Sequence, residues 1–336
     1  MVSFLLFLTV QMTFYAPINI ALIKYWGKVD EDNIIPLNES ISVSLDIYTK
    51  TRVENSKELE FYLNTIKENL GKHPRIVQCV SRFEYICRSR AVAFTNVKIE
   101  TFNQFPTASG LASSASGAVA LVLALNDHFK LNLSTEQLSV LARLTSGSAC
   151  RSIFGNFVKW SMKESNLGND LFPYSQSRAV PIESSLQLFG LIVVLDLQTK
   201  KVSSTKGMAN TVKTSILFEK RMETIEEKIR NMEVYIKSND FEKLAMLTMK
   251  DAMNFHACCL DTYPPISYLN DKSIAIISNI HDYNANGIKS CYTFDAGANA
   301  VLLFDTIDHR LDFKVQYCSE MTTIECQISN GPYESK

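Results

Sequence analysis

The chain has 336 residues, 46% of them hydrophobic and 21% charged, which is the composition of an ordinary soluble globular protein with a sizeable core. Its 34 basic and 35 acidic residues leave a formal net charge of −1, so no overall field attracts nucleic acid or an anionic membrane surface. The 5 histidines show no metal-ligand spacing, and the 8 cysteines without a CxxC pair favour reduced, buried thiols in a cytoplasmic protein.

Strand patterns dominate the first hundred residues. Residues 4–10 are apolar, but they lack the basic start and the cleavage site of a secretory signal and are too few to cross a bilayer. We therefore expect a first strand there. Alternating apolar and β-branched residues predict further strands between residues 16 and 70, for instance at 41–47, and another strand at 90–102.

Helices and strands alternate in the rest of the chain. The pattern Ser134-Thr-Glu-Gln137 is a capping box and predicts the start of a helix. The composition shifts near residue 200, so we predict an α+β protein with two lobes, residues 1–198 and 199–336, and a ligand cleft between them. Helices are predicted at 112–129, 134–145, 208–237, 240–255 and 271–282, strands at 158–162, 188–197, 292–294 and 300–304, and a polar surface loop at 164–178.

The most informative motif is a run of small residues at 105–117 that leads into an apolar helix. Gly110 and Gly117 let the backbone turn and approach a ligand closely. Three serines place hydroxyls beside the backbone N–H groups at the positive end of the helix dipole, which suits phosphate. These serines are Ser113, Ser114 and Ser116. The alternative is a helix start whose small residues only permit close packing, since the lysine of a Walker loop is absent.

Residues 16–28 end in a cluster of basic and aromatic side chains. Lys24 lies next to Tyr25 and Trp26 and follows a lone Asn19 in an otherwise apolar stretch. A lysine flanked by an amide and two aromatic rings can hold an anion at the edge of a pocket. The alternative is an ordinary strand end with a surface lysine.

Residues 145–152 combine hydroxyl groups with a guanidinium. Ser146 and Ser148 alternate around Gly147, and Arg151 follows three residues later. The planar fork of an arginine matches the oxygens of a carboxylate or a phosphate, so this segment can clamp such groups. The alternative is a tight turn with a surface arginine.

Two polar turns complete the set. Residues 202–208 supply serine and threonine hydroxyls, either as phosphate contacts or as the N-cap of the following helix. Asp295 lies between an apolar strand and a glycine-containing turn, where its carboxylate can act as a general base or ligate a metal. A turn-forming aspartate is the alternative.

Together these five segments resemble the diphosphomevalonate decarboxylases of the galactokinase–homoserine kinase–mevalonate kinase–phosphomevalonate kinase (GHMP kinase) superfamily. The most specific strings are Lys-Tyr-Trp-Gly-Lys at 24–28 and Ser-Gly-Ser-Ala-Cys-Arg at 146–151. The resemblance implies the GHMP kinase fold, with a ribosomal protein S5 domain 2-like N-terminal lobe, a ferredoxin-like C-terminal lobe and the active site between them. Members of the family are usually homodimers.

The resemblance also implies the reaction. In the mevalonate pathway of isoprenoid and sterol biosynthesis, the family converts (R)-5-diphosphomevalonate and ATP to isopentenyl diphosphate, carbon dioxide, ADP and phosphate, with Mg²⁺. No nucleic acid and no membrane is an expected partner.

Roles for individual residues follow from the same resemblance. Asp295 is expected to orient or deprotonate the tertiary hydroxyl of the substrate, and Arg151 is expected to hold the substrate carboxylate. Lys24 and Ser114 are the other catalytic candidates. The predicted substrate-binding residues are Asn19, Lys24, Tyr25, Trp26, Ser146, Ser148 and Arg151. The predicted ATP-binding residues are Ser109, Gly110, Leu111, Ala112, Ser113, Ser114 and Ser116.

Two features depart from the family pattern. The family usually has proline at the position of Ala298. Residues 305–326 match the family poorly, and the helical region expected before the final strand is missing from the pattern. Two alternatives therefore stay open: a kinase of the same superfamily that phosphorylates a small alcohol without decarboxylation, and a shortened, non-catalytic isoform.

Overall fold

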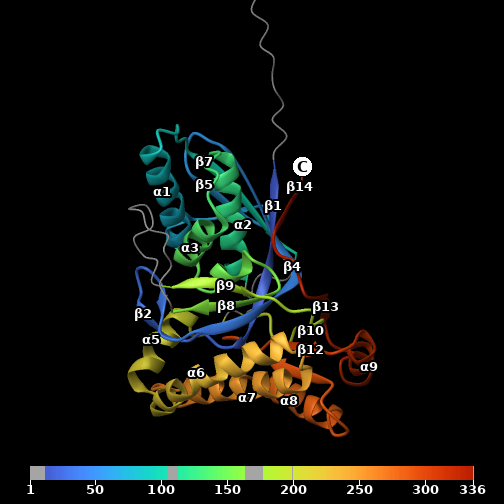
Figure 1. The fold of residues 1–336 in the computed structure, drawn as a ribbon. Coiled ribbons are helices and arrows are strands. Elements are labelled where there is room, and N and C mark those ends of the chain that lie inside the picture. The colour runs from blue at the N-terminus through green and yellow to red at the C-terminus, as the bar shows by residue number, and fades with distance from the viewer. Residues whose placement is uncertain (1–11, 105–112, 163–176, 199, 336) are drawn as a thin grey trace, which may run out of the picture.

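The computed structural model describes residues 12–104, 113–162, 177–198 and 200–335. The strand predicted at 4–10, most of the polar loop predicted at 164–178, and residues 105–112 of the run of small residues lie outside these ranges. The described part of the chain is built mainly on two sheets, and each sheet is covered by helices (Figure 1).

The larger sheet has eight strands within the described residues, in the order β14-β1-β4-β7-β5-β6, with β8 beside β4 and β9 beside β8. Its centre is the long antiparallel pair of β1 and β4. The first half of β4 is buried on both faces, whereas burial alternates along its second half. The strands are β1 Thr13–Ile23, β4 Ser40–Asn55, β5 Glu60–Leu63, β6 Ile66–Lys67, β7 Val97–Asn103, β8 Phe157–Ser161, β9 Arg178–Ile182 and β14 Tyr333–Ser335.

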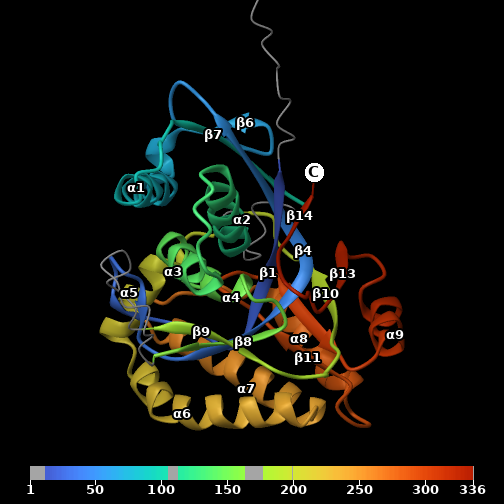
Figure 2. The same cartoon turned by 45° about the horizontal axis from the view of Figure 1, so that its top comes forward.

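Helices cover one face of this sheet, with α2 packed on β1 and β4 (Figure 2). The predicted capping box is confirmed at the start of α3, where Ser134 Oγ accepts from Gln137 N–H and the Gln137 side chain accepts from Ser134 N–H. The helices of this lobe are the 3₁₀ turn η1 Leu70–Lys72, α1 Pro74–Ser89, α2 Ser113–His128, α3 Thr135–Thr145 and the short α4 Ala149–Ser152. The small hairpin β2 Lys28–Asp30 and β3 Ile35–Pro36 follows β1.

The second sheet is antiparallel, in the order β11-β12-β10-β13, and α6, α7 and α8 form the layer at the bottom of Figure 1. Its strand β10 begins at residue 189, before the predicted lobe boundary at 198/199, which stays a prediction. The elements are β10 Phe189–Val193, α5 Ser204–Thr214, α6 Ile216–Lys237, α7 Phe241–Leu260, α8 Asp271–Tyr283, β11 Ser290–Thr293, β12 Ala300–Phe304, α9 Ile307–Tyr317 and β13 Thr323–Gln327.

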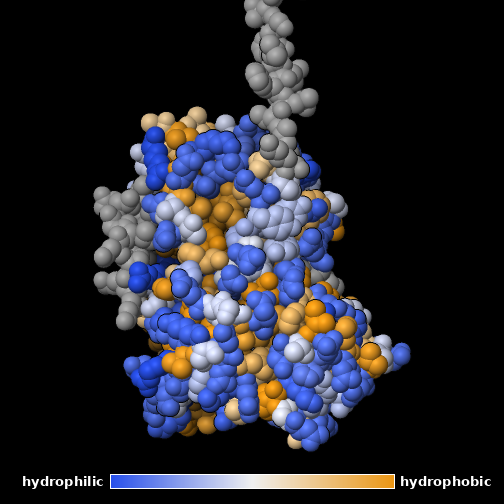
Figure 3. All heavy atoms as spheres, turned by 45° about the vertical axis from the view of Figure 1, so that its right-hand side comes forward, coloured by the Kyte–Doolittle hydropathy of each residue, from blue (hydrophilic) through white to orange (hydrophobic). Residues whose placement is uncertain are grey.

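One hydrophobic cluster joins the two sheets. Ile18 and Val43 of the first sheet belong to the same buried cluster as Ile229 of α6 and Leu302 of β12. Burial of this apolar surface holds the lobes in one arrangement. Hydrophilic residues cover most of the face shown in Figure 3, with hydrophobic ones interspersed.

Most predicted elements occur within a few residues of their expected positions, but several predictions were incomplete or wrong. The strand predicted at 90–102 begins only at Val97. The helix predicted at 208–237 is two helices, because Ser215 adopts an extended conformation and caps α6 by accepting from Phe218 N–H. A helix is present before the final strands after all: Thr306 caps α9 through His309 N–H. Helix α1 was not predicted.

The chain returns to the first sheet at its C-terminal end. Asn156 N–H donates to Ser329 C=O (2.7 Å), and Ser329 N–H donates to Ser44 C=O (2.9 Å), before β14 pairs with β1. Gly155 makes this crossing possible. It has φ +70°, and a Cβ built on it would lie 2.2 Å from the carbonyl carbon of Asn330.

We expect the substitution Gly155→Ala to lower the free energy of unfolding by about 2–4 kcal/mol, because it adds a backbone clash to a left-handed conformation. The matched control is Gly287→Ala, since Gly287 also has positive φ (+114°) but no atom within 4 Å of the added Cβ. Gly287→Ala should lower the free energy of unfolding by about 1–3 kcal/mol, from backbone strain alone. Urea denaturation of both variants measures the difference, and equal losses would contradict the close-approach argument.

Candidate active site

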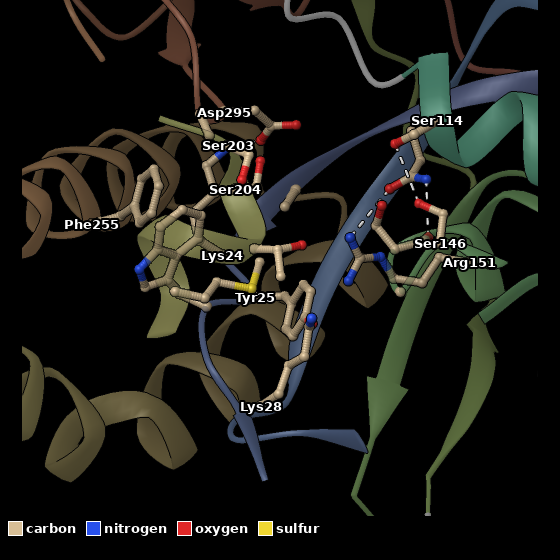
Figure 4. A pocket seen from close by; sticks show the side chains of 18 of the residues that line it. Lys24, Tyr25, Lys28, Ser114, Ser146, Arg151, Ser203, Ser204, Phe255 and Asp295 are labelled. Carbon is tan, nitrogen blue, oxygen red and sulfur yellow. Dashed lines mark hydrogen bonds and ion pairs between the residues drawn. The ribbon is translucent and has the colours of Figure 1, made fainter. Parts of the chain in front are cut away.

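A cavity of about 320 Å³ lies where the end of β1 meets helices and loops of both lobes (Figure 4). Residues from segments far apart in the chain line it. They are Asn19, Ala21, Lys24, Tyr25, Trp26, Lys28, Arg75, Ser114, Ser146, Gly147, Ser148, Arg151, Lys200, Ser203, Ser204, Thr205, Met208, Phe255, Asp295 and Ala296.

An ion pair between the lobes lies in this cavity. Lys24 follows β1 directly, and its Nζ is 2.8 Å from Oδ1 of Asp295, which follows β11. Lys24 is 3% exposed, whereas the Asp295 side chain is 34% exposed and so faces the cavity. Burial lowers the pKa of Lys24, and the attraction of Asp295 opposes that shift. The pair thus fixes a carboxylate that a ligand can still reach.

Arg151 is a buried cation held by neutral groups. Its Nε donates to Ser42 Oγ (2.8 Å), its Nη1 to Ser40 Oγ, and its Nη2 to Asn19 Oδ1 (3.2 Å). Among the described residues, no carboxylate forms an ion pair with it. Burial lowers the pKa of Arg151, but its charge persists because guanidinium is so basic. This position therefore favours an anionic ligand group, such as a carboxylate.

Asn19 supports that arginine from β1. Its Nδ2 donates to Ser152 Oγ (2.7 Å) and to the backbone C=O of Ser148 (3.2 Å), which orients its Oδ1 toward Arg151. The lone amide in an apolar strand thus connects the cavity wall to α4.

Two aromatic side chains line the cavity beside Lys24. Tyr25 packs against Trp160, with ring centroids 4.7 Å apart, and burial raises its pKa. Trp26 is buried against Phe255 in an edge-to-face contact, also with centroids 4.7 Å apart. These rings give the cavity rigid apolar walls between its charged groups.

The described lining of the cavity carries five basic side chains and a single carboxylate, that of Asp295. Arg75, Lys28 and Lys200 supply the three cations besides Lys24 and Arg151. Although the whole chain has a net charge of only −1, this local excess attracts a polyanion. Sequence reasoning did not single out Arg75, Lys200 or Phe255 as site residues. Arg75 and Lys200 lie outside the motifs described above.

Hydroxyl groups also line the cavity, with Ser203 and Ser204 near Asp295 and Ser114 and Ser146 near Arg151 (Figure 4). Ser146 Oγ lies 3.3 Å from Ser114 Oγ, which projects from the first turn of α2. Ser203 caps α5 by accepting from Lys206 N–H and also lines the cavity, so both of its predicted roles are compatible. Lys200 Nζ donates to Ser204 Oγ (3.0 Å).

The structure brings most of the predicted site residues together. Nine of them line the cavity: Asn19, Lys24, Tyr25, Trp26, Ser114, Ser146, Ser148, Arg151 and Asp295. Ser116 is not among them, because its buried hydroxyl shares a 2.7 Å hydrogen bond with Thr49 under the helix. Ser113 is the first residue of α2. The predicted ATP-binding residues Ser109, Gly110, Leu111 and Ala112 lie outside the described residues.

A second cavity of about 690 Å³ adjoins the first and shares the side chains of Arg75, Ser114, Ser146, Ser203 and Thr205 with it. Much of its remaining wall is apolar, with a basic residue at one side. An apolar cavity that opens onto a helix N-terminus suits a flat ring joined to phosphate. The lining residues outside the shared set include Phe61, Leu63, Lys72, Ile76, Ala118 and Leu121.

His256 lies behind the ion pair, next to Phe255 on α7. It is almost fully buried, and burial together with the nearby charge of Lys24 lowers its pKa to about 3. The side chain is therefore neutral around pH 7 and adds no charge to the site.

Within the described ranges, no group of three or more His, Cys, Asp or Glu side chains is arranged to hold a metal ion. All 8 cysteines are described, buried and free, as the sequence predicted. The described helices include none with the length and hydrophobicity to span a bilayer.

Two family models match the chain and together cover most of it. The model of the diphosphomevalonate decarboxylase-like N-terminal domain matches residues 16–172, and that of the mevalonate 5-diphosphate decarboxylase C-terminal domain matches residues 190–332. The diphosphomevalonate decarboxylase of Candida albicans is 42% identical over 356 residues, covering 95% of this chain and 96% of the relative.

Solved structures of similar proteins share the fold. The mevalonate diphosphate decarboxylase of Staphylococcus aureus superimposes with a TM-score of 0.85 at 33% identity, covering 97% of this chain and 98% of the other. A structure described as MDDEF in complex with MVAPP, AMPPCP and magnesium superimposes with a TM-score of 0.84 at 32% identity, covering 97% and 99%.

The buried His256 predicts a pH dependence of stability. An unfolded histidine binds a proton below about pH 6.5, whereas His256 in the fold does so only near pH 3. The unfolded state therefore binds more protons between these values, and stability falls as the pH drops through this window, by up to about 1.4 kcal/mol per pH unit.

Urea denaturation at pH 6.0, 5.2 and 4.5 measures this slope. In His256→Gln, the free energy of unfolding should fall less steeply with decreasing pH than in the unsubstituted protein. Parallel curves for the two proteins would contradict the assignment.

Proposed function

Because the chain belongs to the diphosphomevalonate decarboxylase family, we propose that the cavity around Lys24, Arg151 and Asp295 is where this family's reaction occurs. The activity is the ATP-dependent decarboxylation of 5-diphosphomevalonate to isopentenyl diphosphate, carbon dioxide, ADP and phosphate, in the mevalonate pathway. The roles of individual residues form the proposal developed below.

One observation carries the proposal: Arg151 and Asp295, the two groups the chemistry needs, line one cavity with four basic side chains besides Arg151. The substrate has a carboxylate, a tertiary hydroxyl and a diphosphate. It needs an anion site for the first, a base for the second and cations for the third. The lining supplies all three kinds of group.

In the first step, Asp295 orients the tertiary hydroxyl and accepts its proton while the hydroxyl oxygen attacks the γ-phosphorus of ATP. A new O–P bond forms and ADP leaves. Lys24 Nζ, 2.8 Å from Asp295 Oδ1, keeps the carboxylate at the mouth of the cavity. Phosphorylation matters because a tertiary alcohol is a poor leaving group and a phosphate is a good one.

In the second step, the C–O bond to phosphate breaks and leaves positive character at C3. The electron pair of the bond between the substrate and its carboxylate then forms the alkene, and carbon dioxide leaves. Arg151 holds the carboxylate in line until this happens. Its neutral partners leave its charge available for that purpose.

The diphosphate end is held by hydroxyls and cations of the same cavity. We assign it to Ser146, Ser148, Tyr25 and Lys24, with Asn19 and Trp26 shaping the wall. Charge-assisted hydrogen bonds to such oxygens are stronger than neutral ones. Because the diphosphate does not take part in the reaction, these contacts contribute to substrate binding.

ATP fits the adjoining cavity of about 690 Å³, with its base on the apolar wall and its phosphates toward the start of α2. Ser114 lines both cavities and is suited to contact the γ-phosphoryl group. The backbone and side chains of Ser109–Ser113 are proposed as further phosphate contacts on the family resemblance.

Magnesium fits the described residues in the manner usual for nucleotide sites. Mg²⁺ commonly takes one or two protein oxygens and completes its shell with phosphates and water. The Ser114 hydroxyl and the Asp295 carboxylate line the cavity and are oxygen ligands of the preferred kind. When bound, the ion would neutralise charge on the transferred phosphoryl group.

We also propose, on the family resemblance, that the protein acts as a homodimer in the cytoplasm. Analytical ultracentrifugation tests the first statement, since a monomer at micromolar concentration would contradict it. Fluorescence microscopy of a tagged chain tests the second, and a signal confined to an organelle would contradict it.

The direct test measures the release of ADP and of carbon dioxide together, when purified protein is supplied with ATP, Mg²⁺ and 5-diphosphomevalonate. Equal release of both is expected. Asp295→Asn should lower kcat by about 10²–10⁴-fold, the usual contribution of a general base, with much smaller effects on substrate binding. ADP without carbon dioxide would instead indicate a kinase of the same superfamily.

Ser146→Ala should mainly weaken substrate binding. We expect the KM for 5-diphosphomevalonate to rise about 10-fold while kcat stays within about twofold, because a contact to a distant phosphate is made equally in ground and transition states. Ser184→Ala is the control, since Ser184 bonds Ile236 C=O away from the cavity. A loss of kcat without a change in KM would contradict the assigned role of Ser146.

A further inference from the structure

Two buried side chains outside the cavity hold the main chain of Lys24. We infer that the ion pair of Arg221 on α6 and Asp251 on α7 positions Lys24 for catalysis, although neither residue lines the cavity. The inference rests on the proposed function, because it concerns a residue assigned to that reaction.

The ion pair is bidentate and fully buried. Arg221 Nη1 lies 2.7 Å from Asp251 Oδ1 and Nη2 lies 2.9 Å from Oδ2, with both side chains 0% exposed. Lys228 adds a second cation 3.2 Å from Asp251 Oδ1. Burial tends to raise the pKa of Asp251, but the charges of Arg221 and Lys228 and the hydrogen bonds from Arg221 and from Lys24 N–H together lower it. A pair with this geometry has little freedom to move.

The same pair binds both polar groups of the Lys24 backbone. Asp251 Oδ2 accepts from Lys24 N–H (2.8 Å), and Arg221 Nη2 donates to Lys24 C=O (3.3 Å). Asn38 Nδ2 donates to the same carbonyl (2.9 Å). Lys24 directly follows the last residue of β1. Its backbone groups therefore bond to side chains in place of a neighbouring strand.

This arrangement links one lobe to the other. Lys24 belongs to the chain that leaves the first sheet, whereas Arg221 and Asp251 lie on helices that cover the second. Asp295, the partner of Lys24 Nζ, follows a strand of that second sheet. Lys24 is therefore attached to the second lobe at its backbone and at its side-chain tip.

A lysine side chain has four rotatable bonds, so the position of its ammonium group depends on where its backbone begins. Because Arg221 and Asp251 hold the backbone of Lys24, its ammonium group contacts Asp295 in a single geometry. Without the ion pair, Lys24 would shift, and a displacement of about 1 Å can lower a catalytic rate about 100-fold. Arg221 and Asp251 thus act through Lys24, as positioning residues.

The test is a double-mutant cycle with Lys24→Met. Arg221→Met and Asp251→Leu are introduced together, so that neither member of the pair is left as a lone buried charge. In the otherwise unsubstituted protein, this change should lower kcat about 10–100-fold, with the KM for ATP within about twofold. In the Lys24→Met background, the same change should lower kcat less than about threefold, because its effect passes through Lys24.

The control removes a partly buried ion pair that does not touch the site, with the side chains of Arg310 and Glu325 11% and 36% exposed. Arg310 on α9 pairs with Glu325 of β13 (2.8 Å), and the double substitution Arg310→Met with Glu325→Leu should lower the melting temperature while leaving kcat unchanged. If this control lowers kcat as much as the Arg221/Asp251 change does, the effect is general destabilisation and the inference is overturned.

The outcomes separate the two proposals. If Lys24→Met alone keeps the full kcat, the assigned role of Lys24 is wrong, and the inference falls with it. If Lys24→Met is impaired but the Arg221/Asp251 change lowers kcat equally in both backgrounds, only the positioning inference is wrong. Should the double variant not fold, Arg221→Lys enters the same cycle. This substitution keeps the buried positive charge but loses the bidentate hydrogen bonds of the guanidinium. It should lower kcat about 3–10-fold only when Lys24 is present.

Discussion

The contact between Lys24 and Asp295 is the constraint on which the rest of the site depends. The two residues are 271 positions apart in the chain, and they meet only because one hydrophobic core joins the two sheets. A lysine from the first sheet thus reaches the acid that follows a strand of the second. The cavity, its basic lining and the adjoining nucleotide-sized cavity all lie around this junction.

Buried charge without a protein counter-charge is costly unless a ligand supplies one. Arg151 is an example, because three neutral oxygens hold its guanidinium and no described carboxylate forms an ion pair with it. In the proposed function, the carboxylate of the substrate supplies that counter-charge. Lys24 differs, since Asp295 and the nearby Asp251 both favour its charged form. The two buried cations of the cavity therefore differ: Lys24 is in an ion pair with Asp295, and Arg151 is in none with a described residue.

Sequence patterns were informative where a function needs neighbouring residues and uninformative where it needs distant ones. Lys24 and Arg151 lie in short motifs, so they could be singled out, as could Asp295 at its strand end. Arg75 stands alone at the start of α1, and nothing near it indicates that the helix points it at the cavity. Local signals also explain the fold: the capping box of α3 could be predicted, whereas the break at Ser215 depends partly on Asp261, which accepts from the Ser215 hydroxyl in the folded state.

The return of the chain to the first sheet has a consequence for how the protein is made. Tyr15 of β1 pairs with Tyr333 of β14, and Ser44 and Asn156 bond to Ser329, so the first lobe is completed by residues that leave the ribosome after the strands and helices of the second lobe. The N-terminal lobe cannot reach its final form while the second lobe is still being synthesised. The order of translation therefore makes the two lobes mature together, at the moment when the acid at the mouth of the cavity is already in place.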